Sequence, residues 1–323
     1  MSQFDDKIRQ DSGIPLLYGN VSQVGPSKVF YVNPTIGSDG NPGTKMEKPF
    51  STVAAAYAAA TTNNHDLIVL SANAAHAATD ELAVTKGRVH FLGLDAVGRY
   101  LGQRTRWTMG VTTGTAIAIV QNTGVGNTFQ RIKFDSADTT TTSVYAFADG
   151  GEYTVVEECE IVKSTDLDQA GMAEVLMNGD SSYFRKCYIG SLVHEKTAAN
   201  TNVLLTRETI TGKVCRDSMF EDCIFGLKST SATASHVHST LATDVERFLI
   251  FKNCLFVVAK LSSATVGDAI IVDTAQTEGQ IILMNSYNVN STAIGTTGSV
   301  GIQYAGAAVA TAATAGNAIA VTD

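Results

Sequence analysis

Charged residues, proline and long apolar runs are all scarce in this chain of 323 residues. Charged residues make up 17% of it, and all five prolines lie before residue 50, so a motif that contains proline is excluded from the rest of the chain. No apolar stretch reaches the length of a membrane span, and the first ten residues carry acids where a signal peptide has its apolar run. We therefore expect no membrane partner, no signal peptide and synthesis in a cytoplasm.

Positive charge is also in short supply. Lysine and arginine number 23 against 31 aspartates and glutamates, which gives a formal net charge of −8. A surface of this sign repels phosphate groups, so we expect no nucleic-acid partner.

Five cysteines are present, but none of them forms a CxxC pair. The sequence therefore lacks the spacing that is typical of zinc sites and of thioredoxin-like redox motifs. Their odd number, together with the expected cytoplasmic synthesis, favours reduced thiols over disulfides.

One short pattern recurs along the middle of the chain. An apolar residue is followed by two polar residues, a small residue, and then a return to apolar residues. The copies begin at Phe129-Gln-Arg-Ile132, Val156-Glu-Glu-Cys159, Phe184-Arg-Lys-Cys187, Phe220-Glu-Asp-Cys223 and Phe251-Lys-Asn-Cys254, with a weaker one at Leu283-Met-Asn-Ser286. Steps of 27 to 36 residues between copies predict a solenoid.

The residues inside each copy favour strands over helices. The second half of a copy alternates apolar and polar side chains and is rich in Phe, Ile, Val and Tyr. We predict an all-β fold, a single-stranded right-handed parallel β-helix. Length variation is assigned to connecting segments outside the stacked strands, such as residues 190–201 and 228–244.

Four cysteines occupy the aligned small position of the repeat: Cys159, Cys187, Cys223 and Cys254. If coils stack at the interstrand distance of roughly 4.8 Å, the four thiols form a row inside the solenoid. A straight row does not converge on one point as metal ligands do, so we interpret it as core packing and predict no metal site.

Polar positions of the repeat form two columns in which the sign of the charge alternates. The first column is Gln130, Glu157, Arg185, Glu221 and Lys252, and the second is Arg131, Glu158, Lys186, Asp222 and Asn253. Opposite charges on adjacent strands attract, so this order supports the proposed stacking. It also favours a structural role for these acids over general acid and base catalysis.

The two ends of the chain differ from the repeats. Residues 1–28 contain glycines and prolines without periodicity and are predicted to be an arm, and residues 29–291 are assigned to the β-helix. A strand is expected at residues 29–33 and a capping helix near 50–60, with Ser51 or Thr52 as its N-cap. Residues 292–323 are rich in Ala, Gly and Thr and are predicted to close the last coil or pack on a neighbouring subunit.

The segment Phe30-Tyr-Val-Asn-Pro34, followed by Gly37-Ser-Asp-Gly-Asn-Pro-Gly-Thr44 and Pro49-Phe-Ser-Thr52, resembles the entry segment of pectate lyase-like β-helix proteins. Residues 82–94 resemble an early coil of that superfamily. The resemblance implies a fold and leaves the function open, because the superfamily includes lyases, hydrolases, tailspikes and noncatalytic structural proteins.

The enzyme motifs of this superfamily are not found in the expected coils. The lyase motif Arg-x-Pro-x-x-Arg needs a proline, and the sole tryptophan, Trp107, has no Trp-Ile-Asp-His context. The hydrolase motif Arg-Ile-Lys does occur at Arg131-Ile132-Lys133, but it precedes the place of its partner motifs, and we interpret it as chance.

Two other patterns suggest metal binding. His236 and His238 would share one face of a strand, near Asp244 and Glu246, but their Ser/Thr-rich surroundings predict a solvated loop. The run Ser38-Asp-Gly-Asn41 lacks the later bidentate acid of a calcium loop and is interpreted as a turn.

From these observations we predict a noncatalytic virion structural protein, a capsid decoration protein in preference to a tail fibre, and assembly as a homotrimer. Its expected partner is a capsid or other virion protein. The apolar arm residues Ile14, Leu16, Leu17 and Tyr18 are the expected contact. No catalytic residue and no cofactor is predicted. The alternative hypothesis is a tailspike-like β-helix that binds or cleaves a glycan with carboxylates from different coils or subunits.

Overall fold

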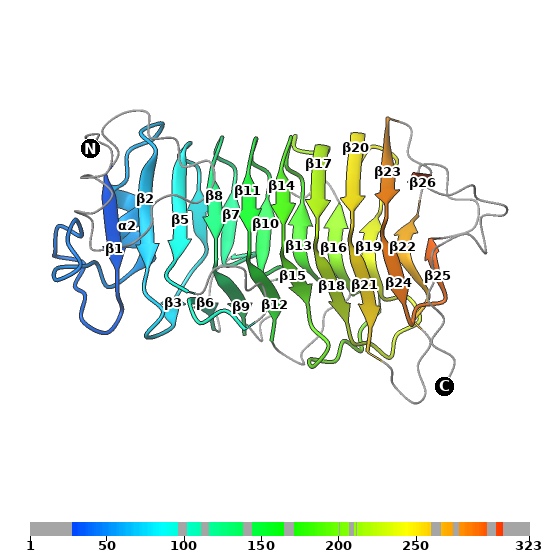
Figure 1. Cartoon of the computed structure of the whole chain (residues 1–323), viewed down its shortest axis with the longest axis horizontal. Helices are drawn as coiled ribbons and strands as arrows, with labels where there is room; N and C mark the ends of the chain where they lie inside the picture. The colour runs from blue at the N-terminus through cyan, green and yellow to red at the C-terminus, as the bar shows by residue number, and fades with distance from the viewer. Residues whose placement is uncertain are drawn as a thin grey trace, which may run out of the picture.

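The chain is a right-handed parallel β-solenoid in a computed structural model (Figure 1). Strands stack along one axis from β1 at the N-terminal end to β26 at the C-terminal end. No helix in the described part of the chain is long and apolar enough to cross a membrane. The structure describes residues 28–95, 102–110, 116–137, 144–164, 171–199, 201–206, 210, 212–259, 266–273, 278–295 and 302–305.

Three parallel sheets form the walls, and each coil passes through them in the order sheet 1, sheet 2, sheet 3. Sheet 1 has ten strands: β1 (Val29–Val32), β2 (Asp66–Leu70), β5 (Val89–Gly93), β8 (Thr128–Gln130), β11 (Val155–Glu157), β14 (Tyr183–Arg185), β17 (Cys215–Glu221), β20 (Val245–Lys252), β23 (Gly279–Met284) and β26 (Ile302–Ala305).

The other two sheets have eight strands each. Sheet 2 contains β3 (His76–Ala78), β6 (Arg106–Met109), β9 (Lys133–Ser136), β12 (Glu160–Lys163), β15 (Tyr188–Gly190), β18 (Ile224–Leu227), β21 (Leu255–Val258) and β24 (Tyr287–Val289). Sheet 3 contains β4 (Leu82–Val84), β7 (Val120–Asn122), β10 (Phe147–Asp149), β13 (Ala173–Met177), β16 (Asn202–Thr206), β19 (Ser235–Ser239), β22 (Asp268–Val272) and β25 (Ala293–Gly295).

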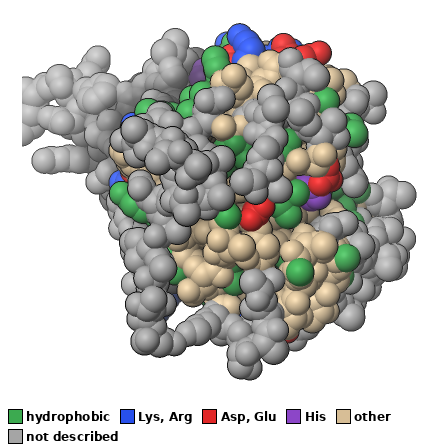
Figure 2. All heavy atoms as spheres, turned by 90° about the vertical axis from the view of Figure 1, so that its right-hand side faces the viewer, with side chains coloured by type: hydrophobic (Ala, Val, Ile, Leu, Met, Phe, Trp, Pro, Cys, Tyr) green, Lys and Arg blue, Asp and Glu red, His purple; other side chains and the backbone are tan. Residues whose placement is uncertain are grey.

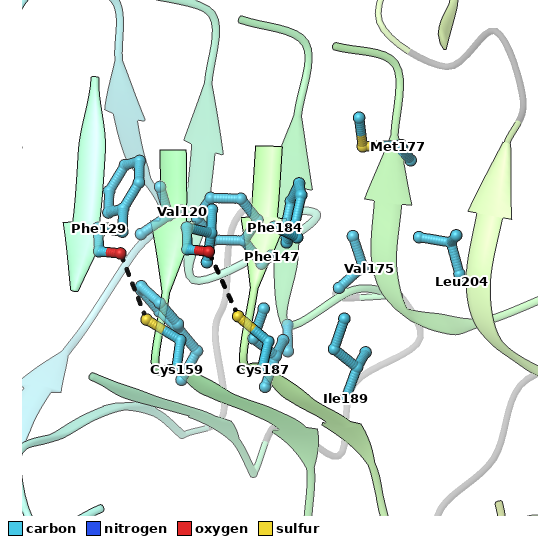
Figure 3. Packing of buried hydrophobic residues seen from close by; sticks show 14 of the residues in the cluster. Val120, Phe129, Phe147, Cys159, Val175, Met177, Phe184, Cys187, Ile189 and Leu204 are labelled. Atoms are coloured by element: carbon cyan, nitrogen blue, oxygen red, sulfur yellow. Dashed lines mark hydrogen bonds between the residues drawn. The ribbon is translucent and has the colours of Figure 1, made fainter. Parts of the chain in front are cut away.

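The interior is filled by side chains at equivalent positions of successive coils. Phe184 stacks on Phe220 with ring centroids 4.6 Å apart, and Phe220 stacks on Phe251 at 5.3 Å. Beside them Cys159, Cys187, Cys223 and Cys254 are free and buried. Figure 3 shows two of these thiols pointing at backbone carbonyls, where the Cys159 Sγ lies 3.5 Å from the Phe129 oxygen.

A short helix packs near the N-terminal end of the solenoid. Helix α2 (Val53–Ala59) buries Val53, Ala56 and Tyr57, and the Thr52 side chain accepts from the Ala55 amide as the predicted N-cap. Asp39, predicted to lie in a turn, holds this cap in place. Its carboxylate accepts from both the amides and the hydroxyls of Ser51 and Thr52 at 2.7–2.9 Å.

The two predicted charge columns differ in backbone conformation. The first column runs along the outward face of sheet 1 with the expected pairing, including Glu157 opposite Arg185 and Arg185 opposite Glu221. The second is a column of turns, because Arg131, Glu158, Lys186, Asp222 and Asn253 all have φ between 51° and 55°. One left-handed residue per coil thus bends the chain from sheet 1 into sheet 2.

The segment at residues 228–244 is not entirely a loop, which corrects the sequence interpretation. It contains β19 of sheet 3, and both His236 and His238 lie buried in that strand. The pattern Ser235-His-Val-His-Ser239 gave no strong strand signal because the residues on either side of Val237 are polar. Strands β25 and β26 lie in the segment predicted to close the last coil, and they pair with β22 and β23.

Candidate binding face on sheet 1

The outward face of sheet 1 gathers charged side chains from four consecutive coils. Register places Glu157, Arg185, Glu221 and Lys252 in one column on β11, β14, β17 and β20. Since neighbouring strands lie roughly 4.8 Å apart, Arg185 and Lys252 are about 10 Å apart along the axis. We call this set the charge ladder.

Each carboxylate of the charge ladder is held by a cation one coil further along the axis. The Arg185 guanidinium donates to Glu157, which also accepts from Gln130 Nε2 at 3.0 Å. Lys252 Nζ donates to Glu221 at 2.6 Å, and the Tyr183 hydroxyl donates to the second oxygen of Glu221. All four charges are therefore matched.

The hydrogen bonds fix the protonation states of these groups. Those from Lys252 and Tyr183 hold the pKa of Glu221 below its usual value, and the bond to Glu221 raises the pKa of Lys252. Burial and the hydrogen bond to Glu221 raise the pKa of Tyr183. A carboxylate whose pKa is lowered is a weak base, so this arrangement suits binding better than proton transfer.

The cations of the charge ladder are more exposed than the carboxylates. The Arg185 side chain is 40% exposed against 17% for Glu157, and Lys252 is 41% exposed against 18% for Glu221. The long basic side chains thus cover their acidic partners, and within the charge ladder the cations are the charges more accessible to solvent.

A second acidic residue of interest lies inside the solenoid. Asp149 is fully buried, and its carboxylate accepts from Asn122 Nδ2 at 2.8 Å, Ser182 Oγ at 2.6 Å and Thr154 Oγ1 at 3.0 Å. Burial raises the pKa of Asp149, and the hydrogen bonds from Ser182 and Asn122 oppose that rise. This network joins three coils and has no access to a substrate, so it is structural.

His236 and His238, the two histidines of the possible metal site, do not act together. The His238 Nε2 lies 2.8 Å from Asp273, whereas His236 packs edge-on against Phe256. Burial lowers the pKa of His236 to about 4. No group of three or more His, Cys, Asp or Glu that could hold a metal ion occurs within the ranges that the structure describes.

The remaining predicted site residues are placed as follows. Lys133 of the Arg-Ile-Lys run pairs with Glu160 at 2.8 Å, and Arg131 occupies a left-handed turn with its guanidinium 3.3 Å from the Asp95 carbonyl. The arm residues Ile14, Leu16, Leu17 and Tyr18 lie outside the described residues. Tyr183 was missed by the sequence interpretation, because its partner Glu221 lies 38 residues away.

Solved structures with the same fold include polysaccharide enzymes. Pectate lyase Pel9A superimposes with a TM-score of 0.59 and 11% identity over 87% of this chain and 69% of that chain. The pectin methylesterase from Aspergillus niger superimposes with a TM-score of 0.57 and 12% identity over 93% of this chain and 92% of that chain. The pectin methylesterase from carrot superimposes with a TM-score of 0.55 and 16% identity over 94% of this chain and 90% of that chain. The chain therefore has the pectate lyase-like β-helix fold. No protein-family model and no curated protein sequence matches it.

Proposed function

We propose that this chain is a glycan-binding β-helix protein that holds an acidic polysaccharide along the outward face of sheet 1 without cleaving it. The observation that carries the proposal is the greater exposure of Arg185 and Lys252 than of the carboxylates behind them. A carboxylate on a sugar can accept from the free donors of either cation.

The geometry of the charge ladder suits an extended polymer. Arg185 and Lys252 are separated by the single strand β17, so their tips repeat along the axis at about twice the interstrand distance. That interval is comparable with the distance between alternate sugar residues of an extended polysaccharide. The solved structures named above as pectate lyase and pectin methylesterase act on such polymers, which supports an acidic glycan as the ligand class.

The pairing of the acids supports binding without cleavage. General acid and base catalysis needs a carboxyl group whose pKa lies near the working pH. Glu221 has the opposite shift, and Glu157 is held by both Arg185 and Gln130. The face is therefore suited to recognition.

Calorimetry with polygalacturonate, and with neutral dextran as the comparison polymer, tests this proposal. The double variant Arg185→Gln with Lys252→Gln should lose at least about tenfold in affinity, because two charge-assisted hydrogen bonds are removed. Arg106→Gln is the matched control, since Arg106 is 50% exposed and pairs with Asp135 on the outward face of sheet 2. Equal affinity of the double variant and the control, or equal binding of dextran, would contradict the proposal.

Cleavage is measured separately on the same polymers. Appearance of unsaturated or new reducing ends, or release of methanol from methylated pectin, would show that the chain is an enzyme. In that case the proposal of binding without cleavage would be wrong, and the chain would be a β-helix enzyme that acts on a glycan.

A virion structural role is the second candidate function. It is favoured by three exposed apolar side chains on the last coils, Phe248 at 44%, Met284 at 36% and Tyr287 at 39%, which suit contact with another protein. In this hypothesis the chain is a capsid decoration protein, a homotrimer that docks through Ile14, Leu16, Leu17 and Tyr18. Copurification with virus particles, lost when residues 1–27 are deleted, would support it; normal particle binding by the truncated chain would contradict it.

A further inference from the structure

The order of charges in the charge ladder is complementary to its own reverse. Along the axis the order is Glu157, Arg185, Glu221, Lys252, which alternates negative and positive. A second ladder that runs antiparallel presents the opposite sign at every position, whereas a parallel ladder at the same level presents the same sign. The ladder therefore fits an antiparallel copy of itself, because opposite charges attract across an interface and like charges repel.

An apolar column runs beside the charge ladder on the same outward face. Two residues before each ladder charge the strand carries an apolar side chain, and these side chains are in register on β11, β14, β17 and β20. The apolar column consists of Val155, Tyr183, Met219 and Ile250. All four are partly exposed, whereas the alternate residues Phe184 and Phe220 are completely buried in the core. A continuous apolar stripe of this kind marks a surface that another molecule covers.

The accessible part of this face begins at β11. Outward residues of the preceding strands are nearly inaccessible, since Leu92 of β5 is 5% exposed and Thr128 and Gln130 of β8 are 4% and 6% exposed. From β11 to β20 each coil presents one charged and one apolar side chain to solvent. The midpoint of these four strands lies between β14 and β17.

We propose that a second copy of this chain binds antiparallel on the outward face of sheet 1, about a two-fold axis between β14 and β17. This axis sets Glu157 opposite the partner's Lys252 and Arg185 opposite the partner's Glu221. By symmetry each contact occurs twice, so all eight ladder charges of the two copies face an opposite charge. The contact is isologous and closes at two copies.

The same axis brings the two apolar columns together. Val155 lies opposite the partner's Ile250, and Tyr183 lies opposite the partner's Met219. A thioether packs favourably against an aromatic ring, and removal of the apolar column from water supplies most of the affinity. Exposed ion pairs add little free energy, so the ladder sets the orientation and the register of the two copies.

Contact through sheet 1 places the two solenoids side by side and leaves their ends outside the interface. Figure 2 looks at the C-terminal end, where hydrophobic side chains lie among polar atoms on the described surface. Head-to-tail contact through the ends would build open filaments, whereas a two-fold contact stops at a dimer. The size of the assembly therefore distinguishes the two modes.

The dimer also closes the face that we assign to a glycan, and this part of the inference rests on the proposed function. Sheets that pack face to face lie about 10 Å apart, and side chains fill the space between them. An acidic polysaccharide and a second copy therefore compete for Arg185 and Lys252. Self-association keeps the glycan face covered until the glycan displaces the second copy.

Sedimentation equilibrium of the full chain without glycan tests the association. We expect a dimer whose dissociation constant rises at least about tenfold between roughly 0.05 M and 0.5 M salt, because salt screens the ladder charges. A monomer at concentrations up to about 100 µM, a trimer, or an open series of larger species overturns the proposal.

Cross-linking of the variants Val155→Cys and Ile250→Cys tests the antiparallel register. A short bismaleimide should link a mixture of the two variants and neither variant alone, because residue 155 of one copy faces residue 250 of the other. The native cysteines are buried and should not react. Val155→Cys mixed with Val193→Cys, at a position 74% exposed and outside sheet 1, is the control for random collision. An unlinked mixture, or a covalent dimer of Val155→Cys alone, overturns the proposal.

A ladder with every charge inverted tests the role of the charges. The variant combines Glu157→Lys, Arg185→Glu, Glu221→Lys and Lys252→Glu, so the signs still alternate within the chain and between two antiparallel copies. It should form dimers with itself but not with the unmodified chain, because like charges would then meet at every position. Mixed dimers in the statistical proportion, measured by native mass spectrometry, would show that the ladder does not set the pairing.

Addition of polygalacturonate to the mixture of Val155→Cys and Ile250→Cys tests the competition. The polymer should abolish the cross-link, and neutral dextran should leave it unchanged. A cross-link that persists while polygalacturonate is bound overturns the competition. A cross-linked dimer that does not bind polygalacturonate contradicts the proposed function and leaves the self-association established.

Discussion

Arg185 donates to Glu157 of the preceding coil and at the same time lies opposite Glu221 of the following coil. A single cation is thus placed between two carboxylates 64 residues apart in sequence. This position makes Arg185 the most informative residue of the charge ladder for testing both stacking and binding.

Reversing this charge should destabilise the solenoid. Arg185→Glu sets three carboxylates in a row and should lower the free energy of unfolding by about 1 kcal/mol, as judged from the urea midpoint. Lys45→Glu is the control, since Lys45 is exposed and the structure describes no ion pair for it. Equal shifts in the two variants would mean that the ladder charges do not interact.

The thiols of the cysteine row should resist reagents in the native protein. Burial raises the pKa of Cys159 and of Cys223, and it does the same for Cys215, so little reactive thiolate forms at neutral pH. Native protein should therefore take up almost no thiol-specific label, and urea-denatured protein should take up five labels per chain, one at each cysteine. Tyr153→Cys, at an exposed position, is the positive control. Rapid labelling of Cys187 in native protein would refute the packing described above.

Stability should fall as the pH is lowered from about 6.5 to about 4. Burial lowers the pKa of His90 and of His236 in the folded protein from the ordinary value of about 6.5 to about 4, so the unfolded chain binds protons first as the pH falls. The stabilisation is therefore present above pH 6.5 and is lost as pH falls toward 4, on the order of 3 kcal/mol for each histidine. His236→Phe should reduce this pH dependence in chemical denaturation. An unchanged slope in the variant would exclude His236 as a contributor.

Removing the buried carboxylate should be more costly than removing one of its donors. Asp149→Leu leaves the buried Ser182 and Thr154 hydroxyls without their acceptor and removes one of the two acceptors of Asn122 Nδ2, and it should cost about 3 kcal/mol. Ser182→Ala should cost about 1 kcal/mol. The free energy of unfolding of both variants is measured by urea denaturation. A larger loss for Ser182→Ala than for Asp149→Leu would show that the network is not centred on Asp149.

Much of the fold was predictable because the repeat is visible in local sequence. The alternation after Cys159 or Cys223 identified strands of sheet 2, and alignment of the repeats on their small position gave the register of Glu157 with Arg185. The strand at β19 was not predictable, since its polar residues are buried by segments distant in sequence. The same holds for Tyr183 with Glu221 and for Asp149 with Ser182, whose contacts join different coils.

The repeated interior has a consequence for how the chain finds its register during folding. If a coil paired with the coil after next in place of its neighbour, Phe184 would still pack against Phe251 and Cys187 against Cys254. The core packing alone would therefore hardly distinguish this mispaired state from the native one. On the outer surface the same slip would set Glu157 against Glu221 and Arg185 against Lys252, and like charges would repel. Alternating charge therefore encodes the order of coils that the uniform core leaves ambiguous, and screening by salt should make refolding more error-prone.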